Sequence, residues 1–206
     1  MSTKLLCCLI VSHLLISVAN EDVDIAKLFI QENIVPELIR YPPAKLLKVV
    51  YPKGEVTPGS YWWSNETSEA PSVHWDAEPN THYCLYMASV NRYDPDTLLY
   101  PYTKHPVTVP EPPTNTGEMW VVTNIPGNDL AKGNTIVWYL IPGPPLGENA
   151  KERIVFLLYK QPTSNITVKE VEWKEAGYNV PDLDNLTRFE DEYNLGKPLF
   201  GNFFYI

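Results

Sequence analysis

The sequence has few cysteines, and this limits how its fold can be held together. Cys7 and Cys8 lie near the amino terminus, so Cys84 is the only cysteine in the rest of the chain. A domain with one cysteine forms no internal disulfide bond and depends on its hydrophobic core. About 185 residues suffice for such a core, because a domain of this length buries most of the surface that its unfolded chain exposes.

Long apolar runs are missing outside the first residues. Lys4 precedes an apolar stretch from Leu5 to Leu15, and Ser17-Val18-Ala19 supplies the small residues at which signal peptidase cleaves. The run is too short and too interrupted to span a bilayer, which needs about 20 apolar residues. We therefore predict a signal peptide over residues 1–19, a single domain over residues 20–206, secretion to the extracellular space, and no stable membrane insertion.

Basic residues are outnumbered. The chain has 16 lysines and arginines against 25 acidic residues, a net charge of −9, and loss of the leader with its one lysine makes the charge more negative. This balance disfavours binding to phosphate backbones and to anionic membranes. Nucleic acid is therefore excluded as a partner.

The sequence also lacks the usual catalytic and metal-binding patterns. His74, His82 and His105 are not at metal-ligand spacings, and no Gly-x-Ser-x-Gly or glycine-rich phosphate loop occurs. Acid pairs such as Asp94 with Asp96 are more typical of turn capping than of acid–base catalysis. We predict a protein that is not an enzyme and that holds no metal or cofactor.

Three sequons fit a secretory route. They begin at Asn65, Asn165 and Asn185, each followed two residues later by threonine. Such triplets also occur by chance, so each one alone is a weak signal. All three are predicted glycosylation sites.

Most of the chain has the pattern of a β protein. The spacing of apolar residues predicts short helices only over 22–34 and 187–193. In the segment 83–90 both alternating sets of residues are largely apolar, which is typical of a strand covered on both faces. Further aromatic and β-branched runs predict strands at 46–51, 72–76, 119–125, 135–141, 153–159 and 200–206.

Several ordered motifs together resemble the phosphatidylethanolamine-binding protein (PEBP) family. The matching stretches begin near residue 23 and continue to the end of the chain. They are Val35-Pro36-Glu37-Leu38-Ile39 with Pro42-Pro43, the run from Pro71 to Asn80, Thr123 to Asp129, Gly143-Pro144-Pro145, Arg153 to Gln161, and Phe200 to Phe204. The resemblance implies a mainly β fold in which a large antiparallel sheet packs on a smaller sheet, with a few short peripheral helices.

The resemblance also implies a small anion pocket at one edge. In members that keep it, the pocket is built from an Asp-Pro-Asp-x-Pro loop, a histidine that opens a strand, a Gly-x-Gly-Pro-Pro turn and a Gly-x-His-Arg segment. Imidazoles and backbone N–H groups then donate to an oxyanion.

In this chain the pocket pattern is altered. Met119 stands at the histidine position, and Glu152 with Arg153 stands where the His-Arg pair is expected, with Ile154 next. Asp94 and Asp96 supply an Asp-Pro-Asp, but a register counted from Tyr83 places Ser89-Val90-Asn91 there instead. The predicted ligand-binding residues are Asp94, Asp96, Met119, Gly143, Pro144, Pro145, Glu152 and Arg153.

These changes leave three hypotheses open. The first is a degenerate headgroup pocket that binds a lipid or another small hydrophobic ligand, lined by Met119, Ile141 and Ile154. The second is a protein-interaction module, such as a protease inhibitor or signalling modulator, that acts through the loop 98–117 or the cluster Tyr61-Trp62-Trp63. We expect Trp62 and Trp63 to pack inside their irregular segment. The third, a retained hydrolytic activity, is the least supported.

Overall fold

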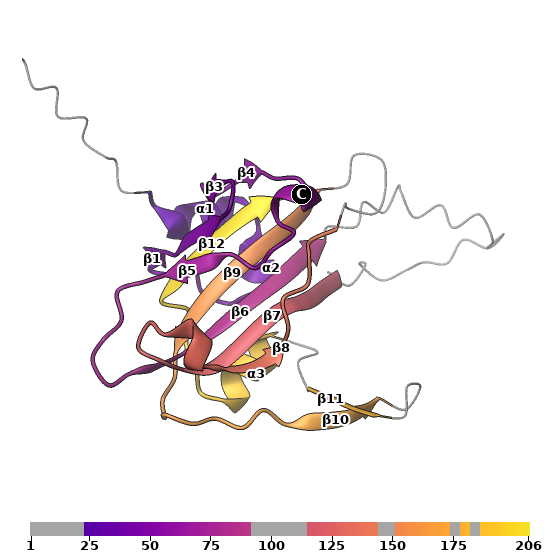
Figure 1. Ribbon diagram of the computed structural model, residues 1–206. Helices are drawn as coiled ribbons and strands as arrows, with labels where there is room; N and C mark the ends of the chain where they lie inside the picture. The colour runs from indigo at the N-terminus through magenta and orange to yellow at the C-terminus, as the bar shows by residue number, and fades with distance from the viewer. Residues whose placement is uncertain (1–22, 92–114, 144–150, 174–177, 182–185) are drawn as a thin grey trace, which may run out of the picture.

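The computed structural model describes residues 23–91, 115–143, 151–173, 178–181 and 186–206. These segments form two sheets, a separate two-stranded hairpin and three short α-helices (Figure 1). The predicted leader, the Asp94 to Asp96 loop and the Pro144-Pro145 turn lie outside the described residues.

A seven-stranded sheet forms the centre of the molecule. Its strand order is β1-β12-β9-β6-β7-β8, and β4 pairs with the far end of β12. The strands are β1 (Lys45–Leu46), β4 (Ser60–Tyr61), β6 (His82–Asn91), β7 (Asn115–Pro126), β8 (Asn134–Val137), β9 (Glu152–Lys160) and β12 (Phe200–Tyr205). Neighbouring strands are antiparallel except that β1 and β4 run parallel to β12, so the sheet is mixed.

The smaller sheet lies against one face of the large one. It has the order β3-β2-β5, with β2 (Lys48–Tyr51) between β3 (Gly54–Glu55) and β5 (Ser72–His74). A cluster of buried side chains fills the space between the sheets, including Tyr51, Met87, Ile154 and Phe204. The predicted packing of a large sheet on a small one is confirmed.

The helices cover the opposite face. They are α1 (Ile25–Gln31), α2 (Ile34–Glu37) and α3 (Leu186–Glu192). Asp24 caps the amino end of α1, because its carboxylate accepts a hydrogen bond from the Lys27 amide at 3.1 Å. Helix and sheet residues meet in a second cluster that includes Phe29, Tyr86, Leu157 and Phe189.

Strand β6 is covered on both faces, as its pattern predicted. Leu85 and Met87 belong to the cluster between the sheets, whereas Cys84 and Tyr86 belong to the cluster under the helices. Burial raises the pKa of the Cys84 thiol to about 12, which fits a buried apolar side chain rather than a reactive thiol.

Several boundaries differ from the predictions. The strand expected over 135–141 ends at Val137, and residues 138–141 continue alongside β7 through one backbone bond, Leu140 N–H to Met119 O at 2.8 Å. The hairpin of β10 (Glu170–Trp173) and β11 (Tyr178–Pro181) was not predicted. The 3-10 turns η1 (Ser64–Glu66) and η2 (Leu130–Lys132) complete the described elements.

Candidate functional site

Two of the predicted pocket residues, Glu152 and Arg153, lie where β9 begins, next to the end of β6 and the start of β7, and Met119 lies further along β7. The register pairs Asn91 of β6 with Asn115 of β7 on one side and with Glu152 of β9 on the other. The same end of β9 is closed by the last residue of the chain, since Ile206 N–H donates to Glu152 O at 3.0 Å. One end of the central sheet therefore gathers the segments that the resemblance assigned to the pocket.

Glu152 faces the small-sheet side of this end. It is two residues from Ile154, which belongs to the cluster between the sheets, and residues two apart in a strand share a face. The Ser89 hydroxyl is near enough to the Glu152 carboxyl group to lower its pKa by hydrogen bonding. A Cβ at Gly117 would lie 3.4 Å from Ser89 Oγ, so Ser89 lies between β7 and β9 on the pocket side.

Burial controls the ionisation of Glu152. Loss of solvent raises the pKa of the carboxyl group above its ordinary value, and the hydrogen bond from Ser89 opposes this only in part. The site therefore presents a carboxyl group whose charge is poorly compensated.

Met119 lies on β7 and forms part of the apolar wall. Its side chain is 8% exposed and packs in the cluster between the sheets, which also contains Ile154. Met119 and Glu152 are on the two strands that flank β6, and their environments differ. Met119 contributes apolar surface, and Glu152 contributes the polar group.

Arg153 does not join these residues. Its side chain is 6% exposed and lies on the helix side of β9, where it donates to the Glu32 carbonyl and pairs with the Glu37 carboxylate. Consecutive strand residues point to opposite faces, so Arg153 turns away from Glu152. This corrects the prediction of Arg153 as a ligand-binding residue, because its guanidinium is held on the helix side by Glu37.

Lys151 also faces away from the pocket side. Its ammonium group lies 5.4 Å from the ring centre of Tyr61 and 5.8 Å from that of Tyr205, whose hydroxyl donates to Glu32. Both basic neighbours of Glu152 in the chain are thus engaged elsewhere. The described part of the pocket end receives no positive charge from β9.

The remaining predicted residues divide between described and undescribed segments. Gly143 is exposed at the end of the segment that passes Met119, next to the buried Pro142. Asp94, Asp96, Pro144 and Pro145 lie outside the described residues. Ser89 lies close to Glu152 although it is not among the residues predicted to bind a ligand. It stands at the position that the register from Tyr83 assigns to the Asp-Pro-Asp loop.

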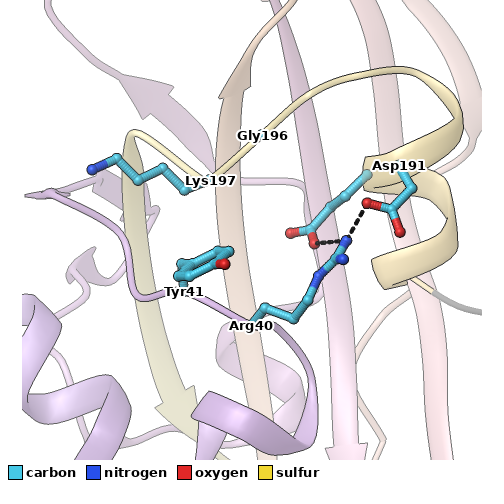
Figure 2. A pocket seen from close by; sticks show the side chains of 6 residues that line it. Arg40, Tyr41, Asp191, Gly196 and Lys197 are labelled. Atoms are coloured by element: carbon cyan, nitrogen blue, oxygen red, sulfur yellow. Dashed lines mark hydrogen bonds and ion pairs between the residues drawn. The ribbon is translucent and has the colours of Figure 1, made fainter.

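A concave region lies on the opposite face of the sheet, beside α3 (Figure 2). It has a volume of about 530 Å³ and is lined by Arg40, Tyr41, Glu190, Asp191, Gly196 and Lys197. Figure 2 shows Arg40 reaching toward Asp191 and Lys197 extending away on the other side of Tyr41. One nitrogen of Arg40, Nη2, contacts Asp191 Oδ1, lies 3.5 Å from Glu190 Oε2, and donates to Thr187 O at 3.0 Å.

Glu190 is the buried end of this network. It is 4% exposed, and its Oε1 accepts a hydrogen bond from the Tyr159 hydroxyl at 2.8 Å. Burial raises the pKa of Glu190, while Tyr159 and Arg40 act in the opposite direction. Since its charges are paired with one another, the network links α3 to the sheet and to the segment after α2.

No metal-binding group appears among the described residues: they contain no cluster of three or more histidine, cysteine or acidic side chains placed to hold an ion. Within the same segments, no helix is long and apolar enough to cross a membrane.

Comparisons with solved structures define the class of fold. The carboxypeptidase Y inhibitor, solved in complex with its cognate proteinase, matches over 91% of this chain and 97% of its own, at 20% identity and a TM-score of 0.63. The phosphatidylethanolamine-binding protein of Plasmodium falciparum matches over 87% of this chain and 95% of its own, at 19% identity and a TM-score of 0.57. The chain thus has the PEBP fold, as its motifs predicted.

Sequence comparisons find two distant relatives, of which one is named as secreted. A 26 kDa secreted antigen of Toxocara canis is 29% identical over 194 residues, which cover 85% of this chain and 62% of the antigen. A Drosophila melanogaster protein with the provisional name odorant-binding protein A5 is 25% identical over 188 residues, covering 90% of this chain and 81% of that protein. No family model matches the chain. The chain therefore has the PEBP fold and distant sequence relatives that carry other names.

Proposed function

We propose that the chain is a secreted PEBP-like binding protein, not an enzyme, whose altered pocket takes a lipid or another small hydrophobic ligand in place of a phosphate headgroup. One observation carries this proposal. The pocket end of the sheet presents the Glu152 carboxyl group at the rim of the cluster that contains Met119 and Ile154, and the cations at 151 and 153 both face the other side.

Electrostatics disfavours a phosphate ligand here. A hydrogen bond to a charged group contributes about 1.5–3 kcal/mol, and the resemblance implies two histidine donors that this chain replaces with a thioether and a carboxyl group. Their loss weakens anion binding by about 3–6 kcal/mol, or two to four orders of magnitude in affinity. A neutral ligand avoids this cost and gains from contact with apolar walls.

The names of the relatives support the same view. One is named a secreted antigen, and the other is named for odorant binding. Both names favour an extracellular location, and the predicted leader and sequons fit it. This chain spans 62% of the antigen, so the activity of that whole protein is not transferred to it.

Headgroup binding by the wild-type protein provides the first test. The protein is secreted from a eukaryotic host, analysed by native mass spectrometry for a co-purified ligand, and titrated with phosphoethanolamine in a calorimeter. We expect a bound apolar molecule and no measurable headgroup affinity. Tight binding of phosphoethanolamine by the wild-type protein would refute the proposal.

A double reversion provides the second test. Met119→His with Glu152→His restores two imidazoles, and we expect phosphoethanolamine binding to appear. Glu69→His with Ala70→His is the matched control, because it makes the same change in charge on an exposed loop. Glu152→His alone covers the case in which a histidine at the buried position 119 disturbs folding. If neither pocket variant gains affinity, the mapping of the pocket is wrong.

One surface favours interaction with a protein as a second candidate function. Trp138, Leu140 and Ile141 are 77%, 52% and 53% exposed, and we call them the 138–141 strip. Tyr139 holds the strip from inside, because its hydroxyl donates to Thr67 O at 2.7 Å and lies 3.1 Å from the Tyr51 hydroxyl. Exposed apolar side chains on a fixed segment are typical of contact surfaces.

The structural neighbour that inhibits a carboxypeptidase suggests how to test this surface. Purified protein is titrated against carboxypeptidase Y, and residual peptidase activity is measured for the wild type and for Trp138→Ser with Leu140→Ser. Ile30→Ser is the control, since Ile30 is 53% exposed on α1. Inhibition that the strip variant loses and the control keeps would favour an inhibitor; absence of inhibition by the wild type would exclude this peptidase as a target.

A further inference from the structure

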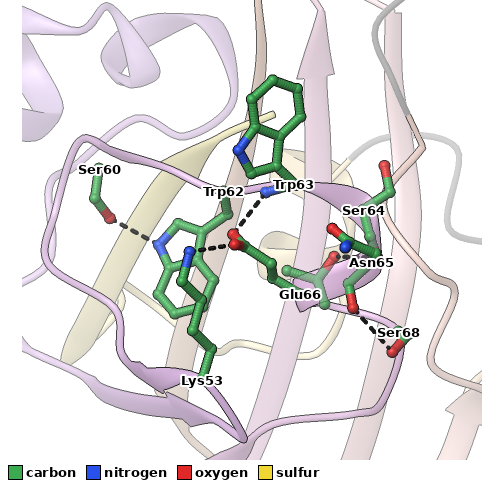
Figure 3. A network of polar contacts seen from close by, with 9 residues as sticks. Lys53, Ser60, Trp62, Trp63, Ser64, Asn65, Glu66 and Ser68 are labelled. Carbon is green, nitrogen blue, oxygen red and sulfur yellow. Dashed lines mark hydrogen bonds and ion pairs between the residues drawn. The ribbon is translucent and has the colours of Figure 1, made fainter.

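Trp63 is an exposed tryptophan on a well-ordered turn, against the expectation that it packs inside its segment. Trp62 is 8% exposed, whereas Trp63 is 74% exposed. Figure 3 shows the two indoles pointing in different directions, with Trp63 directed away from Lys53 and Trp62. Burial therefore does not explain why a large apolar ring stands at position 63.

The backbone around Trp63 is fixed by several hydrogen bonds. The Trp63 amide donates to Glu66 Oε2 at 3.0 Å, and the Glu66 amide donates back to Trp63 O at 2.8 Å. Lys53 pairs with the other oxygen of Glu66 and lies 5.5 Å from the centre of the Trp62 ring. The turn is thus tied to the small sheet.

The sequon at Asn65 occupies the same turn. Thr67 is fully buried, its hydroxyl donates to Ser64 O at 3.3 Å, and its carbonyl accepts from Tyr139. Asn65 is exposed, and the Ser68 hydroxyl donates to its carbonyl at 3.3 Å. Trp63 and Asn65, two residues apart, are therefore exposed side chains on a turn whose other groups are fixed (Figure 3).

We propose that Asn65 carries an N-linked glycan whose first N-acetylglucosamine packs on the Trp63 indole. The bond forms between Asn65 Nδ2 and C1 of the sugar; the amide loses a proton and the diphosphate of a lipid-linked oligosaccharide leaves. One face of the sugar ring consists of C–H groups, which are weakly positive and pack on the negative face of an aromatic ring. Because the turn is already ordered, this contact costs little conformational entropy.

The other described sequon lacks this arrangement. Two residues before Asn165 stands Thr163, whose hydroxyl donates to Asn165 O at 2.9 Å, and the Asn165 side-chain oxygen accepts from Asn124 at 3.1 Å. A glycan at Asn165 has no aromatic ring at the same offset. Asn165 therefore serves as the matched control for an effect that depends on Trp63.

A double-mutant cycle tests the contact, and it rests on the proposed secretory route. The wild type, Asn65→Gln, Trp63→Ser and the double variant are secreted from a eukaryotic host, and their melting temperatures are measured after site occupancy is determined by mass spectrometry. We expect Asn65→Gln to lower the melting temperature by about 2–4 °C when Trp63 is present and by nothing measurable when it is serine. Asn165→Gln is expected to have the same effect in both backgrounds.

Two further measurements separate the possible outcomes. In protein from a bacterial host, which carries no glycan, Asn65→Gln should leave the melting temperature unchanged; an equal loss there would assign the effect to the asparagine and overturn the proposal. In the glycoprotein, ring-current shifts of the first sugar's protons should vanish in Trp63→Ser. Equal effects of Asn65→Gln in both Trp63 backgrounds, or an unoccupied Asn65 in secreted protein, would overturn the proposal while leaving secretion and ligand binding untouched.

Discussion

Two carboxyl groups on opposite faces of the large sheet differ in the partners that surround them. Glu190, under α3, is 4% exposed and has both the Tyr159 hydroxyl and Arg40 as partners. Glu152, at the pocket end of β9, receives the Ser89 hydroxyl, and the neighbouring cations face the other way. Burial raises the pKa of both groups.

The difference separates a structural carboxylate from one that is available to a ligand. A buried charge that is paired and hydrogen-bonded holds elements together, and removing a partner leaves it uncompensated. A half-buried carboxyl group with one neutral donor holds little in place, and it repels anions that approach it. We therefore expect substitutions around Glu190 to change the stability of the fold, and substitutions at Glu152 to change which ligands bind.

Substitution of Arg153 is expected to have the largest effect on the free energy of unfolding. Replacing it with methionine leaves Glu37 and the Glu32 carbonyl without their buried donor, and we expect a loss of about 3 kcal/mol in the free energy of unfolding, measured by urea denaturation. Lys160→Met, on the same strand, breaks an exposed pair with Glu78 and should cost at most about 1 kcal/mol. Equal costs for the two variants would contradict the structural role given to the helix face.

Substitution of Tyr159 is expected to have the next largest effect on the free energy of unfolding. Tyr159→Phe removes the donor to a buried oxygen of Glu190, and we expect a loss of about 1–3 kcal/mol in urea denaturation. Tyr86→Phe is the matched control, because it removes a hydroxyl bonded at 3.2 Å to Glu118, which is more exposed. Ser89→Ala should cost less than about 1 kcal/mol, since Glu152 remains accessible to water. The comparison between the two carboxyl groups fails if Ser89→Ala is as costly as Tyr159→Phe.

The fold could be predicted because its signals are local. The two apolar sides of residues 83–90 predicted a strand covered on both faces, and the structure confirms it. Strands β1 and β4 are two residues each and exist only through pairing with β12, so no local pattern marks them. The exposure of Trp63 was also missed, because its turn is ordered by contacts with Lys53 and Tyr139, which are distant in sequence.

The site could be predicted only in part. Met119 and Glu152 were assigned to the pocket by counting from motifs, but that count does not state on which face a side chain lies. Strict alternation along β9 places Arg153 opposite Ile154 and Glu152, and this rule would have separated them. The contact of Arg40 with Glu190 joins residues far apart in the chain, and no spacing rule anticipates it.

The smallest expected effect is a pH-dependent change in stability caused by Glu152. Because burial raises the pKa of Glu152 in the folded state, the folded protein binds this proton more tightly than the unfolded chain. The carboxyl group therefore costs nothing below its unfolded pKa, about 4.3, and lowers stability as the pH rises through the folded value. Glu152→Gln removes this penalty. Relative to the wild type, the variant should gain about 1 kcal/mol near pH 7.

Unfolding by urea at pH 4 and at pH 7 measures this change, with Glu55→Gln, on the exposed edge of the small sheet, as the control. The gain should be present at pH 7 and absent at pH 4 for Glu152→Gln, and small at both values for the control. A gain that does not change with pH would mean that Glu152 titrates alike in the folded and unfolded chains. In that case the carboxyl group at the pocket end would be solvated, and its repulsion of anions would be too weak to exclude a phosphate headgroup.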